Sequence, residues 1–241
     1  MILALDCSTL TLSLALLRAD GSLVEHRVVG PPIRQSEALP GEIDAILKAH
    51  GHALAEVTGF VVGLGPGSFT GLRIGLATAK GLAYALRKPV AGASSLAALA
   101  LEGPEGVELF ATAVVKKGEL YVGRYRREGQ GVTALEPECS LTLAQVAARL
   151  LAAPEARMIG PALTDYRAPL EALGVPATSF LEGPLVPSAV ALARLATIPA
   201  AFDAEAMFAL EPHYLRGSGA EENPKFPPLP GVEPKARLKE D

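Results

Sequence analysis

The glycine-rich stretch GLGPGSFTGLRIG, residues Gly63 to Gly75, constrains the fold of this chain more than any other feature. It follows the short β-branched run VTGFVVG and leads into a helical pattern over residues 72–86. A strand, a glycine turn and a helix in this order are typical of an α/β unit, because glycine lets the backbone turn tightly beside a buried strand. Two interpretations stay open: the loop could bind an anion at the helix N-terminus, or its glycines could serve close packing alone.

The loop matches neither of the common nucleotide motifs. No Gly-Lys-Ser/Thr follows it, as a Walker loop requires, and the GxGxxG spacing of dinucleotide-binding proteins is absent. Asp6, in the segment DCST after the first strand, has the outline of the first phosphate loop of actin-like and sugar-kinase-like ATPases. The alternative is a turn carboxylate that caps nearby amides. Asp6, Gly65 and Gly67 are therefore the candidates for cofactor binding.

Hydrophobic periodicity predicts the other elements. Three antiparallel strands, joined in part by the Asp20-Gly21 turn, are expected to open the chain. Strands are predicted at residues 2–5, 11–17, 22–29, 57–63, 90–91, 109–115, 119–126 and 157–160. Helices are predicted at residues 36–50, 72–86, 94–101, 142–151, 165–173 and 188–196.

The segment EGPEG, residues 102–106, breaks this pattern and divides the chain into two lobes. Residues 1–103 are expected to form an N-terminal lobe. Residues 104–216 are expected to form a second α/β lobe whose last helix packs back on the first. Residues 217–241 are rich in proline and charge, so we expect a mobile tail that buries too little apolar surface to order.

Composition limits the kind of core that this chain can build and leaves nucleic-acid or membrane contact to local patches. With 49% hydrophobic and only 5% aromatic residues, the core must consist mainly of Ala, Val, Leu and Ile. A net charge of -4 gives no global attraction to nucleic acid or anionic membrane. The chain shows no signal-peptide pattern and no long apolar segment, so we expect a cytoplasmic protein without a membrane contact. Cys7 and Cys139 form no CxxC pair and are expected to be reduced and buried.

The helix predicted at residues 72–86 has two distinct sides at 100° per residue. One side carries small residues that let another element approach closely, among them Gly71, Gly75 and Ala79. The opposite sector is either a solvated face or a docking face, since Tyr and Arg are favoured at interfaces. Its members are Arg73, Ala77, Lys80, Tyr84 and Arg87.

No catalytic constellation stands out elsewhere. The four histidines share no metal-ligand spacing such as HExxH, and no GxSxG nucleophile motif occurs. The residues therefore predict neither a metal site nor a catalytic group.

Four segments together resemble the bacterial TsaB (YeaZ-like) family in order and spacing. They are MILALDCSTLTLSLALL, RQSEALPGEIDAIL, GLGPGSFTGLRIGLATAKGLAYALRKPVAGASSLAALA and EPHYLR. The resemblance is strong over residues 1–100. It implies a two-lobed actin-like fold of the ASKHA, ribonuclease H-like class. It also implies a noncatalytic role beside TsaD, which transfers a threonylcarbamoyl group to the adenosine next to the anticodon of tRNA, with TsaE as an ATPase.

The resemblance further implies partners and residues. TsaD has two metal-binding histidines in a His-Leu-Glu-Gly-His segment, where this chain has Ser95 to Leu99, and neither Ser nor Leu can replace imidazole. The chain is thus expected to hold no cofactor of its own, although ATP or ADP could bind at the interface of the complex. It is expected to contact tRNA only through the complex. In the family, the first two helices contact TsaD, and a homodimer can use the same face. The implied interface residues are Leu39, Ile43, Arg73, Ala77, Lys80, Tyr84 and Arg87.

A second function, from a different class, stays as the alternative. It is an autonomous actin-like ATPase or small-molecule kinase that uses Asp6 and the Gly65–Gly67 loop. Such an enzyme would need a second acidic phosphate loop and an adenosine-pocket motif, and the sequence shows neither convincingly.

Overall fold

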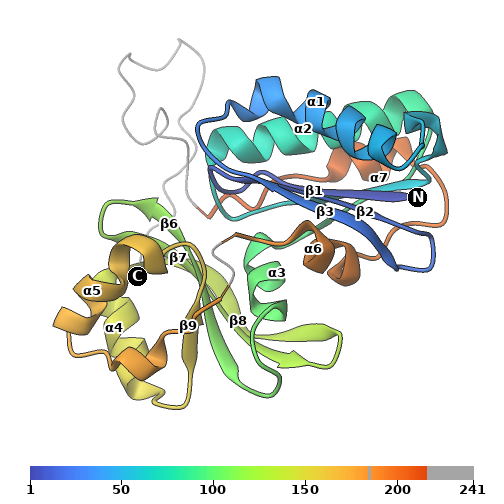
Figure 1. Cartoon of the computed structure of the whole chain (residues 1–241). Helices are drawn as coiled ribbons and strands as arrows, with labels where there is room; N and C mark the ends of the chain where they lie inside the picture. The colour runs from blue at the N-terminus through green and yellow to red at the C-terminus, as the bar shows by residue number, and fades with distance from the viewer. Residues whose placement is uncertain (184–185, 216–241) are drawn as a thin grey trace, which may run out of the picture.

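A computed structural model describes residues 1–183 and 186–215 of the 241-residue chain. Two β-sheets, each flanked by helices, divide this part of the molecule into the two regions seen in Figure 1. The α/β class expected from the sequence is therefore present. None of the described helices is both long and apolar enough to cross a membrane. The predicted tail, residues 217–241, lies outside the described residues.

The first sheet has the strand order β3-β2-β1-β4-β5. Its first three strands pair antiparallel, as predicted, whereas β4 runs parallel to both β1 and β5. The strands are β1 (Ile2–Asp6), β2 (Leu12–Leu17), β3 (Leu23–Val29), β4 (Gly59–Gly63) and β5 (Val90–Ala93). Strands β1 and β4 end side by side, which brings the Asp6 turn next to the glycine-rich loop.

Helices cover both faces of this sheet. On one face lie α1 (Gln35–Ala49) and α2 (Phe69–Leu86), which pack on β2 and on β1, β4 and β5, respectively. On the other face lies α6 (Ala189–Leu195). Because the central strands are covered on both sides, every residue of β2 and β4 is buried, and these strands are almost continuously apolar.

The second sheet has the strand order β8-β7-β6-β9, with only the β6–β9 pair parallel. Its strands are β6 (Glu108–Lys116), β7 (Glu119–Glu128), β8 (Gly131–Thr142) and β9 (Arg157–Ile159). One face packs on α3 (Ser95–Leu101), and the other packs on α4 (Leu143–Ala152) and α5 (Leu163–Ala172). Helices α3 and α6 also pack on each other between the two sheets (Figure 1).

The last part of the described chain returns to the first sheet. Helix α6 buries Ala189 to Leu192 against β1, β2 and β4, and a short helix α7 (Ala204–Ala209) contacts α2. Two 3-10 turns, Leu54–Glu56 and Ala177–Ser179, complete the elements. The division of the chain near residue 103 stays a proposal. It assigns α6 and α7 to the second lobe, whereas both helices pack on elements of the first.

Two elements were missing from the sequence-based expectation. No strand was predicted at β8, which contains Pro137 and several polar residues, yet this segment pairs with β7 along most of its length. Helix α7 is only six residues long, too short for a periodic signal. The cysteines also differ from expectation: both are free, but only Cys7 is buried, whereas Cys139 is partly exposed.

Candidate functional site

Asp6 ends β1 beneath the glycine-rich loop and is fully buried. Its Oδ1 accepts hydrogen bonds from the backbone N–H of Ser8 at 2.8 Å and from the Ser8 hydroxyl at 2.6 Å. Its Oδ2 accepts one from the Ser95 hydroxyl at 2.6 Å. Burial raises the pKa of the Asp6 carboxyl, and these hydrogen bonds oppose the rise. The geometry matches a turn carboxylate that is satisfied within the chain.

The glycines of the loop allow the backbone to pack closely on the turn after β1. A Cβ atom at Gly67 would lie 2.3 Å from the carbonyl oxygen of Ser8, and one at Gly71 would lie 2.0 Å from that of Cys7. Neither distance is tolerable, so any larger residue would separate the loop from the turn. The backbone N–H of Ser68 donates to the carbonyl of Ser8 at 2.7 Å, which fastens the two segments together.

Ser95 joins this turn to the helix between the sheets. Its hydroxyl donates to Asp6 and accepts from the N–H of Gly65 at 3.2 Å, and its own N–H donates to the Gly65 carbonyl at 2.8 Å. Asp6, Gly65 and Gly67 therefore lie together, as the sequence suggested. Ser8 and Ser95, whose hydroxyl groups bond to Asp6, are both buried at this point.

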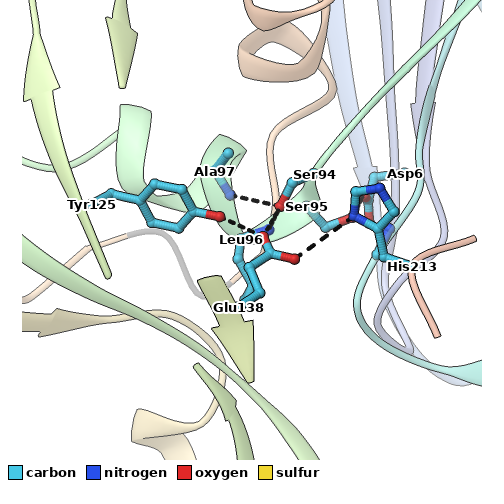
Figure 2. A network of polar contacts seen from close by, with 9 residues as sticks. Asp6, Ser94, Ser95, Leu96, Ala97, Tyr125, Glu138 and His213 are labelled. Carbon is cyan, nitrogen blue, oxygen red and sulfur yellow. Dashed lines mark hydrogen bonds and ion pairs between the residues drawn. The ribbon is translucent and has the colours of Figure 1, made fainter. Parts of the chain in front are cut away.

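A second polar cluster lies between the two sheets, centred on Glu138 of β8 (Figure 2). The hydroxyl groups of Ser94 and Tyr125 both donate short hydrogen bonds to Glu138 Oε1. Ser94 also caps α3, accepting from the N–H groups of Leu96 and Ala97 at 3.1 Å. One carboxylate thus links the N-terminus of α3 to two strands of the second sheet.

His213 brings the returning chain to the same carboxylate. Its Nδ1 lies 3.7 Å from Glu138 Oε2, and its backbone N–H donates to the carbonyl of Leu64 at 2.7 Å. The interaction with Glu138 raises the pKa of His213. A cleft of about 580 Å³ opens beside this cluster and is lined mostly by small and apolar residues. No role was predicted for Glu138, Tyr125 or His213. These residues lie far apart in the chain, so no local sequence motif contains them.

The predicted interface residues separate into three groups. Leu39 is fully buried and belongs to the core of the first sheet, so it supports α1 from beneath. Ile43 and Ala77 line a groove of about 630 Å³ between α1 and α2. The remaining residues, Arg73, Lys80, Tyr84 and Arg87, lie along the edge of α2 next to Ala77, where they contact residues 202–214 instead of lining the groove.

The groove between α1 and α2 is mainly aliphatic. Its lining includes the side chains of Ile43, Leu47, Leu54 and Leu82. Gly81, an exposed residue of the lining, presents no side chain, and a Cβ atom there would meet nothing within 4 Å. This groove has the shape and polarity that suit an apolar helix face of a partner.

Comparisons with known proteins agree with this architecture. A TsaD family model, described as tRNA N6-adenosine threonylcarbamoyltransferase, matches residues 33–170. The tRNA threonylcarbamoyladenosine biosynthesis protein TsaB of Bacillus subtilis is 33% identical over 144 residues, which are 59% of this chain and 62% of that protein. TsaB of Escherichia coli is 34% identical over 134 residues, which are 54% and 57% of the two chains. The chain thus spans about six tenths of the length of these curated relatives.

Two solved structures cover more of the molecule. YeaZ from Pseudomonas aeruginosa is 30% identical, has a TM-score of 0.66 and covers 80% of this chain and 89% of its own. A structure described as an uncharacterized protein with similarity to peptidase YEAZ from Pseudomonas aeruginosa is 29% identical, has a TM-score of 0.70 and covers 89% and 99% of the two chains. The actin-like, ribonuclease H-like fold class expected from the sequence is confirmed by these neighbours.

Proposed function

The chain belongs to the TsaB (YeaZ-like) family, and we propose that it is a noncatalytic subunit that binds a TsaD-type protein in tRNA threonylcarbamoyladenosine biosynthesis. We place it in the cytoplasm, in a complex that includes a TsaE-type ATPase. The proposal has two parts. One is that the chain does no chemistry at the ancestral nucleotide position, and the other is that it acts through its α1–α2 face.

The state of Asp6 is the observation that carries the first part. An ATPase of this fold needs a carboxylate that faces a metal-bound nucleotide, yet both oxygens of Asp6 accept hydrogen bonds from Ser8 and Ser95. Freeing that carboxylate would break these bonds in a buried site, at a cost of about 1–3 kcal/mol for each polar group left without a partner. The chain's own bonds therefore disfavour the alternative of an autonomous ATPase or kinase.

The α1–α2 groove supports the second part. The TsaD-type model matches residues that include both helices, so a TsaD-type partner is expected to carry a counterpart pair. Two such pairs can pack face to face about a pseudo-twofold axis, with the aliphatic lining of each groove covered by the other. A homodimer through the same face would compete with this complex, because one groove cannot hold two occupants.

The test is to reconstitute threonylcarbamoyl transfer to tRNA from purified TsaD-type and TsaE-type proteins, with and without this chain. We expect modified tRNA to form only when the chain is present. The Asp6→Asn variant, which keeps the shape of the side chain and removes its charge, should support the same yield as the wild type. An unchanged product yield without the chain would refute the proposal. Calorimetry with Mg-ATP on the isolated chain covers the alternative function: tight binding that Asp6→Ala abolishes, together with turnover, would establish an ATPase instead.

A further inference from the structure

Aromatic and cationic side chains gather along the edge of α2 that adjoins the α1–α2 groove, on the side that contacts residues 202–214. This aromatic–cation strip includes five of the twelve aromatic residues of a chain that has no tryptophan. Its members are Phe69, Arg73, Lys80 and Tyr84 of α2, Arg87 at the C-terminal cap of that helix, and Phe202, Phe208 and Tyr214 of the returning segment.

At the N-terminal end of the strip, two rings and a guanidinium form a stack. The centroids of Phe69 and Tyr214 are 5.2 Å apart. The guanidinium carbon of Arg73 lies 3.8 Å from the centroid of Phe69, and its Nε donates to the Tyr214 hydroxyl at 2.9 Å. Tyr214 is still 42% exposed, so part of its ring remains open to a ligand.

At the other end, Tyr84 lies between two rings of the returning segment. Its centroid is 5.9 Å from that of Phe208 and 6.3 Å from that of Phe202. Tyr84 and Phe208 are 58% and 62% exposed, unusually high values for large rings that touch each other. Beside them, Arg87 lies over Phe202 at 6.0 Å, and a hollow of about 400 Å³ is lined by Tyr84, Arg87 and Phe202.

The cations of the strip form no ion pair with a carboxylate of the described residues. Among the described residues, no ion pair involves Arg73, Lys80 or Arg87, and Lys80 donates only to the carbonyl of Phe208, at 3.0 Å. The nearby Asp203 is committed to capping α7. Seven-residue spacing along a helix places successive cations about 10 Å apart.

We infer that the aromatic–cation strip binds a single-stranded segment of RNA. Exposed rings stack on nucleobases without regard to sequence, and unpaired cations attract phosphates. The adjoining α1–α2 groove is mainly aliphatic and suits a protein, whereas the strip alternates rings with positive charge, the pattern of a single-strand platform. The inference rests on the proposed function, in which the partner complex presents an RNA substrate. It adds that this chain contacts that RNA itself.

The absence of tryptophan permits a direct test. Phe208→Trp would introduce a single tryptophan at an exposed ring position, where stacking on a base quenches its fluorescence. We expect a saturable quench when a single-stranded RNA oligonucleotide of mixed sequence is added to the full chain or to its complex with the TsaD-type protein. A duplex of the same sequence should quench much less, because its bases are already stacked. No quench in either sample, or an equal one from the duplex, would overturn the inference.

Affinity measurements on variants distinguish the contribution of the aromatic rings to RNA binding from that of the cations. Tyr84→Ala should weaken binding of the single strand about tenfold or more at constant salt. Arg87→Ala should also reduce the slope of log affinity against log salt by about 0.7, since one phosphate contact is lost. The matched controls are Tyr166→Ala and Arg167→Ala on α5, which lie outside the strip and should change neither quantity.

The same variants distinguish this inference from the proposed function. Complex formation with the TsaD-type protein is measured on each variant by size-exclusion chromatography with light scattering. Lost RNA binding with an intact complex supports the strip as an RNA site. Intact RNA binding with a lost complex would show that the strip is a protein interface and would overturn the inference, while leaving the proposed function in place.

Discussion

The Nε of Arg73 donates a hydrogen bond of 2.9 Å to the hydroxyl of Tyr214, a residue 141 positions later in the chain. Arg73 is an exposed residue near the N-terminal end of α2, and Tyr214 lies near the end of the described residues. This bond and the contacts of both residues with the ring of Phe69 fasten the returning segment to α2. The surface of α2 is therefore built from two distant parts of the sequence.

Tyr214→Ala should loosen the returning segment without unfolding the protein. Loss of an exposed hydrogen bond and a ring contact costs about 1 kcal/mol or less of global stability, but local opening becomes easier. Hydrogen exchange followed by mass spectrometry should show faster exchange over residues 202–214 and unchanged exchange in β1 and β4. Tyr214→Phe, which removes only the hydroxyl, should lie between the two. Equal exchange in all three proteins would mean that the contact holds nothing in place.

Two glycines of α2 should respond to alanine in opposite directions. Gly71→Ala would place a Cβ 2.0 Å from the Cys7 carbonyl and should destabilise the protein by about 2 kcal/mol or more. Gly81→Ala meets nothing within 4 Å and should stabilise it by about 0.5–1 kcal/mol through helix propensity. Urea unfolding measures both. Similar effects at the two positions would contradict the close contact between α2 and the turn after β1.

Ser95→Ala should destabilise the fold by about 1–3 kcal/mol, because it leaves the Oδ2 of a buried carboxylate without its hydroxyl donor. The cost depends on the charge of Asp6. In an Asp6→Asn background the same substitution should therefore cost less, and a double-mutant cycle by urea unfolding gives the difference. Additive effects would show that the two side chains do not interact.

The His213–Glu138 pair should make stability depend on pH. The pKa of His213 is raised above 6.5 in the folded state by Glu138, so the stabilising contribution is complete below 6.5 and is lost as pH rises through the folded value. Unfolding midpoints of the wild type and His213→Gln should accordingly differ most near pH 5.5 and converge by about pH 9. Tyr125, which also contacts Glu138, has its pKa raised by burial and stays neutral over this range. A difference that grows with pH would contradict the assignment.

The fold could be predicted from the sequence where local pattern and tertiary packing agree. The Asp20-Gly21 turn indicated the β2–β3 hairpin, and small residues on one side of α2 indicated its closeness to the sheet, as the contact of Gly71 with Cys7 shows. Strand β8 could not be predicted, because Pro137 and its polar neighbours suit a loop and only pairing with β7 makes them a strand.

The sequence predicted some residues of the candidate surfaces but not the contacts that those residues make. Counting around α2 placed Arg73, Lys80, Tyr84 and Arg87 in one sector, and all four contact residues 202–214. Ala77, which was counted in the same sector, lines the α1–α2 groove instead. Counting could not reveal those contacts, since no periodic signal links a helix to a segment more than a hundred residues away. The family resemblance implied that Leu39 belongs to the interface, although its burial in the core leaves it no exposed area.

The central claim is that the chain works by docking a TsaD-type protein on its α1–α2 face. Ala77 lies exposed on α2 beside the groove, and Ala172 lies exposed on α5, so Ala77→Arg and Ala172→Arg make the same change on and off this face. The decisive measurement is the mass, by size-exclusion chromatography with light scattering, of each variant mixed with the TsaD-type protein. The wild type and Ala172→Arg should elute as a complex and Ala77→Arg as separate proteins, because a buried unpaired charge costs several kcal/mol. A complex of undiminished mass with Ala77→Arg, or none with the wild type, would contradict the claim.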